Sequence, residues 1–191
     1  MDDQPAVHRE QVCSRLRSLL LLAAFSRYPA ALDWARGRGE ETWGPIALES
    51  ERFEHRETAY YEASMGADLK KVFFAFQRLI DPAELVGCKL ASNQWELSYQ
   101  QFGRHPEPRP LNLDPGYLTE AKLVLATTKD RDHRLYLDRG IYAEVTLHFQ
   151  RGAWQNRPWT YPDYQRADYH AFFLRCREFL RQRPADKAAA N

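Results

Sequence analysis

The sequence predicts a single α+β domain with a mainly antiparallel, ferredoxin-like sheet, helices packed on one face, and an added C-terminal hairpin and helix. Two observations predict this fold. Apolar runs of strand length alternate with segments whose apolar residues recur every three or four positions, in the order β-α-β-β-α-β and then a helix, a hairpin and a closing helix. The 191 residues, 44% of them hydrophobic and 13% aromatic, are enough to build one ordinary core.

The domain is expected to occupy residues 15–182. Residues 1–14 are polar and show no period, so we expect a flexible N-terminal arm there. Residues 183–191 are expected to form a disordered tail.

The first part of the chain predicts three strands and a helix. The apolar run at 19–25 is too short to span a bilayer as a helix and is typical of a buried strand. Pro29 can open a helix that ends before Gly44. Residues 45–55 predict a half-buried strand, and 69–80 predict a central strand.

A second helix is expected after this central strand, with Asp81 as its cap and Pro82 in the first position. One buried stripe contains Leu85, Cys88, Ser92, Trp95, Tyr99 and Phe102. Lys89, Asn93 and Glu96 form a neighbouring stripe. This second stripe either faces solvent or, if the helix crosses the sheet, faces Asn112.

The stretch "LNLDPGYLT" at 111–119 crowds polar residues around Pro-Gly. We expect a strand that places Asn112 and Asp114 on one face, a turn at Pro115-Gly116 with Tyr117 beside it, and a helix capped by Thr119. The free N–H groups of that helix, with Lys122 as a counter-charge, could bind an anion. Alternatively, Asp114 simply caps the turn.

A hairpin is predicted where 133–138 and 141–149 meet at Asp138-Arg139-Gly140. One face of its second strand contains Ile141, Ala143, Val145 and Leu147. The other face contains Tyr142, Glu144, Thr146 and His148, and Arg134 and Tyr136 can join it from the first strand. This polar face either binds a polar ligand, with Glu144 as a general base, or is a solvated sheet face.

The C-terminal part predicts an aromatic segment at 157–169 and a closing helix. Trp159, Tyr161 and Tyr164 could stack on single-stranded RNA or brace the core. The closing helix has one apolar face, made by Tyr169, Phe172, Phe173, Cys176, Phe179 and Leu180.

Composition disfavours several function classes. Lys and Arg total 27 against 26 for Asp and Glu, so a general DNA-binding role is disfavoured. The 3 cysteines are widely separated, which fits free thiols in the cytoplasm. The histidines show no metal-binding spacing, although a carboxylate-only Mg²⁺ site at Asp114 and Glu144 stays open. No membrane partner is expected.

Several blocks of the chain resemble a known family. "FQRLIDPAEL", "NLDPGYLT", "KLVLATTKD", "YLDRGIYAEVTL" and "PWTYPDY", spread over residues 19–181, are similar to blocks of a bacterial family catalogued only as a domain of unknown function. Its members are sometimes labelled GTP-binding protein, and the resemblance implies no established activity. Because the chain contains no G-x-x-x-x-G-K-[ST] loop, a P-loop GTPase is rejected.

These patterns together favour a protein of unknown function that binds a small anionic or polar ligand. A nucleotide is one candidate, and the expected place is where the 112–119 turn meets the 134–148 hairpin. The alternative is a nucleic-acid or protein interaction module that uses the sheet face and the 157–164 aromatics. No reaction, cofactor or oligomeric state is predicted.

Overall fold

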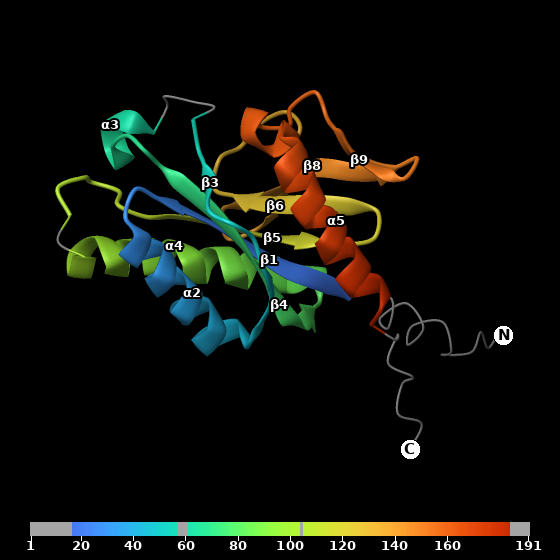
Figure 1. Ribbon diagram of the computed structural model, residues 1–191, viewed down its shortest axis with the longest axis horizontal. Helices are drawn as coiled ribbons and strands as arrows, with labels where there is room; N and C mark the ends of the chain where they lie inside the picture. Colours follow the sequence, from blue (N-terminus) through green and yellow to red (C-terminus); the bar gives the residue numbers. More distant parts are fainter. Residues whose placement is uncertain (1–16, 57–60, 104, 184–191) are drawn as a thin grey trace, which may run out of the picture.

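The computed structural model describes residues 17–56, 61–103 and 105–183 (Figure 1). The expected arm at 1–14 and residues 184–191 of the expected tail lie outside this range. So does Cys13.

A single antiparallel sheet organises the structure, in the order β2-β4-β1-β5-β6-β8-β7, with β3 paired to β4 and β9 paired to β8. Its strands are β1 (Ser18–Ser26), β2 (Ile46–Glu49), β3 (Phe53–Glu54), β4 (Lys70–Ile80), β5 (Asn112–Leu118), β6 (Lys122–Thr127), β7 (Leu135–Asp138), β8 (Ile141–Gln150) and β9 (Ala153–Asn156). The helices are α2 (Pro29–Trp43), α3 (Glu62–Met65), α4 (Leu85–Gly103) and α5 (Ala167–Arg181), with 3-10 turns η1 (Pro82–Glu84) and η2 (Pro162–Gln165).

The predicted fold class is confirmed. Strands β2, β4, β1 and β5 lie in the ferredoxin-like order, with α2 connecting β1 to β2 and α4 connecting β4 to β5. The strands β6, β8 and β7 extend the sheet beyond β5, and α5 closes the chain.

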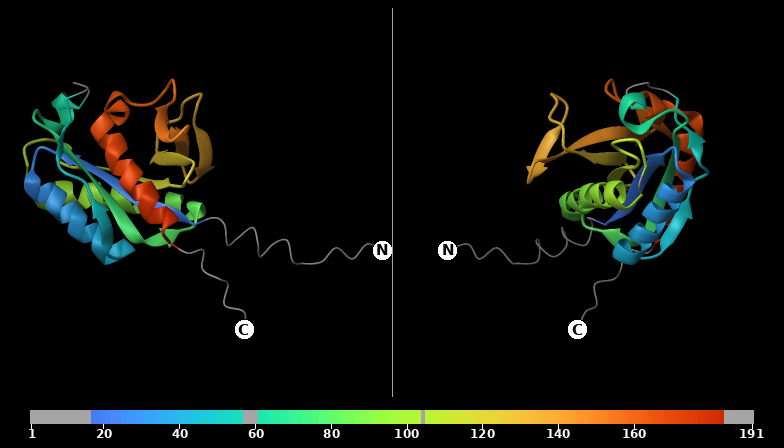
Figure 2. Two further views of the ribbon diagram at one scale, coloured as in Figure 1. Left: turned by 45° about the vertical axis from the view of Figure 1, so that its right-hand side comes forward. Right: turned by 90° about the vertical axis from the view of Figure 1, so that its left-hand side faces the viewer.

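Helices cover both faces of the central strands (Figures 1 and 2). On one face, α2 and α4 bury a cluster that includes Leu20, Leu22, Ala24, Phe74 and Phe76. On the other face, α5 buries a cluster that includes Leu19, Leu21, Ala23, Phe73 and Ala75. Because β1 is covered on both faces, its sequence is a continuous apolar run rather than an alternating one.

Local signals predicted several boundaries correctly. Helix α2 begins at Pro29 and ends before Gly44, whose φ of 91° is favourable for glycine. The Asp81 side chain accepts the Ala83 N–H at 2.8 Å, in a capping box with Glu84. The β7–β8 turn has positive φ at Arg139 and Gly140, as the predicted hairpin requires.

The helix predicted after Thr119 is wrong, and so is the turn at Pro115-Gly116. Strand β5 continues through both residues, and Thr119 instead caps a tight turn by accepting the N–H groups of Ala121 and Lys122 at 3.2 and 3.1 Å. The proline is tolerated because Leu113, two residues earlier, turns its N–H and C=O away from β1 toward α4. Pro115 shares that direction, so its missing N–H costs no bond to β1.

A strand, β6, follows that turn instead of the predicted helix. Its apolar residues are buried on both faces of the sheet, which suits a continuous apolar run. An anion site at a helix N-terminus is therefore excluded at this position. Residues 45–55 also differ from expectation, since they form two short strands, β2 and β3, rather than one.

Two burial predictions are also wrong. Phe102 is 68% exposed rather than part of the buried stripe of α4. A register shift between β6 and β8 moves Leu147 into the α5 cluster, away from Ile141 and Val145. Glu144 and Thr146 are buried, so this polar face is not a solvated one.

Among the helices of residues 17–56, 61–103 and 105–183, none combines the length and apolar character needed to cross a membrane.

Candidate functional site

The site arises where strands β5 and β6 separate. They are paired only from Gly116 to Leu118 on β5, so Asn112–Asp114 has no neighbour from β6. A Cβ added at Gly116 would lie 2.4 Å from the Val124 carbonyl oxygen. Glycine therefore permits the close approach just before the two strands diverge.

Helix α4 replaces the missing strand partner. The Glu96 carboxylate accepts the Leu113 N–H at 2.7 Å, and the Lys89 ammonium donates to the Leu113 carbonyl at 2.8 Å. Arg109 holds the other oxygen of Glu96 at 2.9 Å. The stripe predicted at Lys89, Asn93 and Glu96 thus faces β5, as expected if the helix crosses the sheet, and not solvent.

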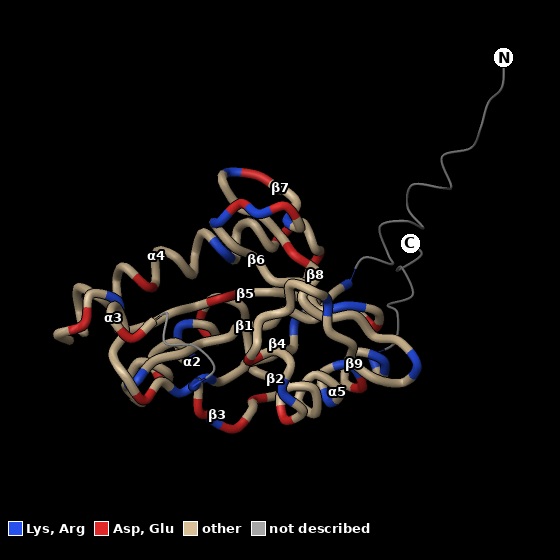
Figure 3. Tube along the Cα trace, turned by 90° about the horizontal axis from the view of Figure 1, so that it is seen from above, with Lys and Arg blue, Asp and Glu red and all other residues tan. Residues whose placement is uncertain are grey.

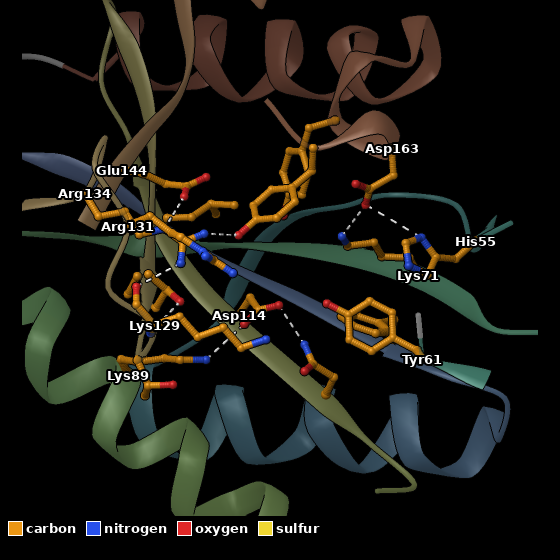
Figure 4. Close-up of a pocket in the computed structure, with 18 of the residues that line it drawn as sticks. His55, Tyr61, Lys71, Lys89, Asp114, Lys129, Arg131, Arg134, Glu144 and Asp163 are labelled. Atoms are coloured by element: carbon orange, nitrogen blue, oxygen red, sulfur yellow. Dashed lines mark hydrogen bonds and ion pairs between the residues drawn. The ribbon is translucent and has the colours of Figure 1, made fainter. Parts of the chain in front are cut away.

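A cavity of about 490 Å³ occupies the gap, and we call it the β5–β6 cavity. Its lining residues are Phe25, His55, Tyr61, Lys71, Lys89, Asn93, Arg109, Asn112, Asp114, Leu125, Ala126, Thr127, Thr128, Lys129, Arg131, Arg134, Glu144, Tyr161, Pro162, Asp163 and Tyr164. Figure 4 shows Asp114 between two groups of side chains, with Lys89, Arg131 and Arg134 on one side and Tyr61 and His55 on the other.

Asp114 lies at the centre of a cationic environment. It accepts Lys89 at 3.0 Å and the Asn112 amide at 2.7 Å. Burial acts to raise the pKa of the Asp114 carboxyl, but the positive charges of Lys89, Lys71 and Arg109 outweigh it and leave that pKa below its ordinary value. This carboxylate is therefore held ionised.

Glu144 forms a second charged group with the β6–β7 loop and the segment before η2. It accepts Arg134 at 2.8 Å and Thr146 at 3.3 Å, and His133 lies 3.3 Å away. Arg134 also donates to the Tyr161 hydroxyl at 2.6 Å. Burial, with the nearby negative charge of Glu144, raises the pKa of Tyr161 to about 12. Arg134 thus connects Glu144 on β8 to Tyr161, which precedes η2.

A third charged group is also buried. The Lys71 ammonium lies 2.6 Å from Asp163, and His55 Nδ1 lies 3.6 Å from the same oxygen. Lys71 also lies 4.4 Å from the Tyr164 ring centroid. These residues were missed by sequence reasoning, although a lysine inside the run "KVFFAF" is a visible anomaly.

The structure brings together six of the predicted site residues: Lys89, Asn93, Asn112, Asp114, Arg134 and Glu144. Glu96 lies directly behind them through Arg109. The predicted residues Tyr117, Thr119, Lys122 and Tyr142 do not line the cavity.

Each of these four has another environment. Tyr117 packs against the helix-covered cores and Thr119 caps a turn. Lys122 is exposed opposite His148, and Tyr142 contacts Tyr136 edge to face.

The aromatic segment at 157–164 contributes one wall. Tyr161 and Tyr164 line the cavity. Trp159 stacks on His133 with ring centroids 5.1 Å apart, and its indole N–H donates to the Val145 carbonyl at 3.0 Å. These contacts brace the segment against β8.

The charges of the lining favour an anion. Six of the described lining residues are cationic, and three, Asp114, Glu144 and Asp163, are acidic. Glu96 lies behind Arg109 as a fourth acidic residue, and the cationic residues still outnumber the acidic ones. Asp114 and Glu144 are each bound to a cation, which opposes their use as Mg²⁺ ligands. The described ranges contain no cluster of three His, Cys, Asp or Glu residues that could hold a metal ion.

Charged residues of both signs also crowd the β6–β7 loop (Figure 3). This loop carries Lys129 and Arg131, both exposed. Both residues also line the cavity.

Comparison with known proteins adds a family but no activity. No curated protein and no solved structure matches the chain significantly. Residues 17–179 match the family described as Domain of unknown function (DUF4416). Because this match covers most of the 191 residues, the chain belongs to that family.

Proposed function

We propose that this protein binds a small organic anion in the β5–β6 cavity. The observation that carries the proposal is the excess of cationic over acidic side chains around a cavity of about 490 Å³. That volume is in the range of small-molecule sites, roughly 300 to 1,000 Å³.

The cations are held in place before any ligand arrives. Lys71, Lys89 and Arg134 each contact a carboxylate at 3.0 Å or less. Fixed donors need not reorganise on binding, and partial burial strengthens their interaction with an anion. Such an arrangement supports selective binding rather than loose surface attraction.

Arg131 is the cation best suited to contact a ligand directly. Within the part of the chain that the structure describes, no hydrogen bond or ion pair engages its side chain. Its guanidinium can therefore offer a planar, two-pronged donor to an oxyanion. A nucleotide is one candidate ligand, and it would bind without a P-loop.

A thermal-shift panel of nucleotides, sugar phosphates and organic acids tests this proposal. A bound anion raises the melting temperature by mass action. Arg131→Gln should reduce the ligand-induced shift and leave the melting temperature of the unliganded protein nearly unchanged. The matched control is Arg139→Gln, since Arg139 lies at the β7–β8 turn and contacts Asp138 outside the cavity.

Two results would contradict the proposal. One is the absence of any shift across the whole panel. The other is a shift that Arg131→Gln and Arg139→Gln reduce equally, since this would mean that anions bind the surface without a site. Binding to polyanions that weakens steeply with salt would point instead to a nucleic-acid module.

A further inference from the structure

We infer that the ligand has two parts, a planar ring and a dianionic head such as a phosphate group, lying at opposite ends of the β5–β6 cavity. This inference rests on the proposed function and specifies its ligand class. It follows from the uneven distribution of charge and aromatic rings along the cavity.

The head end lies beneath the β6–β7 loop, on the side of Lys89, Arg131 and Arg134 (Figure 4). Lys89 uses two of its three N–H groups, on the Leu113 carbonyl and on Asp114. Its third N–H and the guanidinium of Arg131 are available to a ligand oxygen. Thr128 also lines the cavity.

Several donors on different elements suit a head with more than two oxygens. A carboxylate has two oxygens and a single charge, whereas a phosphate monoester has three terminal oxygens and about two charges. A phosphate can therefore accept from the helix α4 side and the loop side together. A carboxylate can engage Arg131 but leaves the Lys89 donor unmatched.

The ring end holds aromatic side chains next to the ion pair of Lys71 and Asp163, whose charges offset each other. Tyr61 and His55 lie there (Figure 4), and both rings contact Phe25, at centroid distances of 5.0 and 5.1 Å. A planar ring entering this end adds to an existing aromatic group through edge and face contacts. An aliphatic chain gains apolar contact there but lacks the ring quadrupole that favours edge and face packing.

A polar side chain on helix α4 also lines the cavity. Asn93 lines the cavity, and its amide makes no hydrogen bond to another residue of the described ranges. It offers both a donor and an acceptor. A ring with polar edges, such as a heterocycle, would use both.

Titration calorimetry with three probes separates the two parts of the ligand. The probes are phenyl phosphate, inorganic phosphate and benzoate. We expect phenyl phosphate to bind about tenfold or more tightly than inorganic phosphate, because only the former fills the ring end. We expect a similar advantage over benzoate, because only the phosphate head uses both groups of donors.

Two variants locate the parts within the cavity. Arg131→Gln should weaken phenyl phosphate and inorganic phosphate by the same factor, about five- to tenfold. Tyr61→Leu should weaken phenyl phosphate alone. The matched controls are Arg139→Gln and Tyr136→Leu, because neither residue lines the cavity.

The outcomes distinguish this inference from the proposed function. If inorganic phosphate binds as tightly as phenyl phosphate and depends on Arg131, the ring end is wrong but anion binding stands. If benzoate binds as tightly as phenyl phosphate, the dianionic head is wrong. If none of the three probes binds and the wider panel is also silent, both proposals fall.

Discussion

Removing the ammonium of Lys71 tests whether the buried pair with Asp163 anchors the C-terminal segment to the sheet. The two side chains are 4% and 7% exposed, and their charged atoms lie 2.6 Å apart. Lys71→Met keeps most of the side-chain volume but leaves the Asp163 carboxylate without its main partner. Breaking one partner of a buried pair costs about 3 to 5 kcal/mol, against roughly 0 to 1 kcal/mol at the surface.

We therefore expect Lys71→Met to lower the free energy of unfolding by about 4 kcal/mol. For a domain of this size that corresponds to a fall in melting temperature of roughly 8 to 16 °C. Urea denaturation followed by circular dichroism measures the loss. Arg38→Met is the matched control, since its pair with Glu41 is exposed and should change stability by less than about 1 kcal/mol.

A double-mutant cycle with Asp163→Asn identifies the cause. If the loss comes from the unpaired buried carboxylate of Asp163, the double variant Lys71→Met/Asp163→Asn should be about 2 kcal/mol more stable than the sum of the two single losses predicts. A loss below about 1 kcal/mol for Lys71→Met, or strict additivity in the cycle, would refute this account.

Four further predictions follow from the fold and the site. Phe76→Ala should cost about 3 to 5 kcal/mol of unfolding free energy in urea denaturation, because the ring is fully buried, and a loss below about 1 kcal/mol would contradict this. Gly116→Ala should cost about 1 to 3 kcal/mol by the same measurement, because its methyl group would collide with a backbone carbonyl, and full stability would disprove the close approach. Because the pKa of Asp114 is lowered in the folded protein, its carboxylate stabilises the fold above the unfolded pKa near 4, and this stabilisation is lost as pH falls through the folded pKa. Asp114→Asn should therefore make the free energy of unfolding less dependent on pH on the acid side, and an unchanged pH dependence would contradict this. Burial raises the pKa of Cys88 to about 11, so alkylation at neutral pH should be slow in the native protein and fast in urea, and equal rates would show that this thiol is accessible.

The elements that sequence reasoning placed correctly are those fixed by neighbouring residues. Strand β1 is an apolar run, the 3-10 turn η1 that leads into α4 begins at Asp81-Pro82, and the β7–β8 turn contains Gly140. In each case the residues that determine the structure are adjacent or one helical turn apart. Local propensity is then sufficient.

The elements that were wrong depend on distant residues. Pro115-Gly116 has the composition of a turn. Strand β5 accommodates the proline because the backbone N–H that it lacks would point away from β1, on the side where Leu113 bonds to α4. This arrangement depends on a helix that is distant in the sequence. Lys71 and Asp163 are separated by 92 positions, so no spacing in the sequence relates them. The candidate site was therefore found in part, on β5, α4 and β8, and missed where β4 and η2 meet.

The bond pattern around Leu113 has a consequence for how this family can change over time. A strand partner held by main-chain bonds keeps a fixed spacing of about 4.8 Å whatever its side chains are. Here the partner is a pair of side chains, Lys89 and Glu96, whose lengths set the gap between helix and strand. Replacing either one with a shorter or longer polar residue would resize the β5–β6 cavity while every other strand pairing stays in register. Point substitutions on one helix would thus change the volume of this cavity without insertions in the sheet.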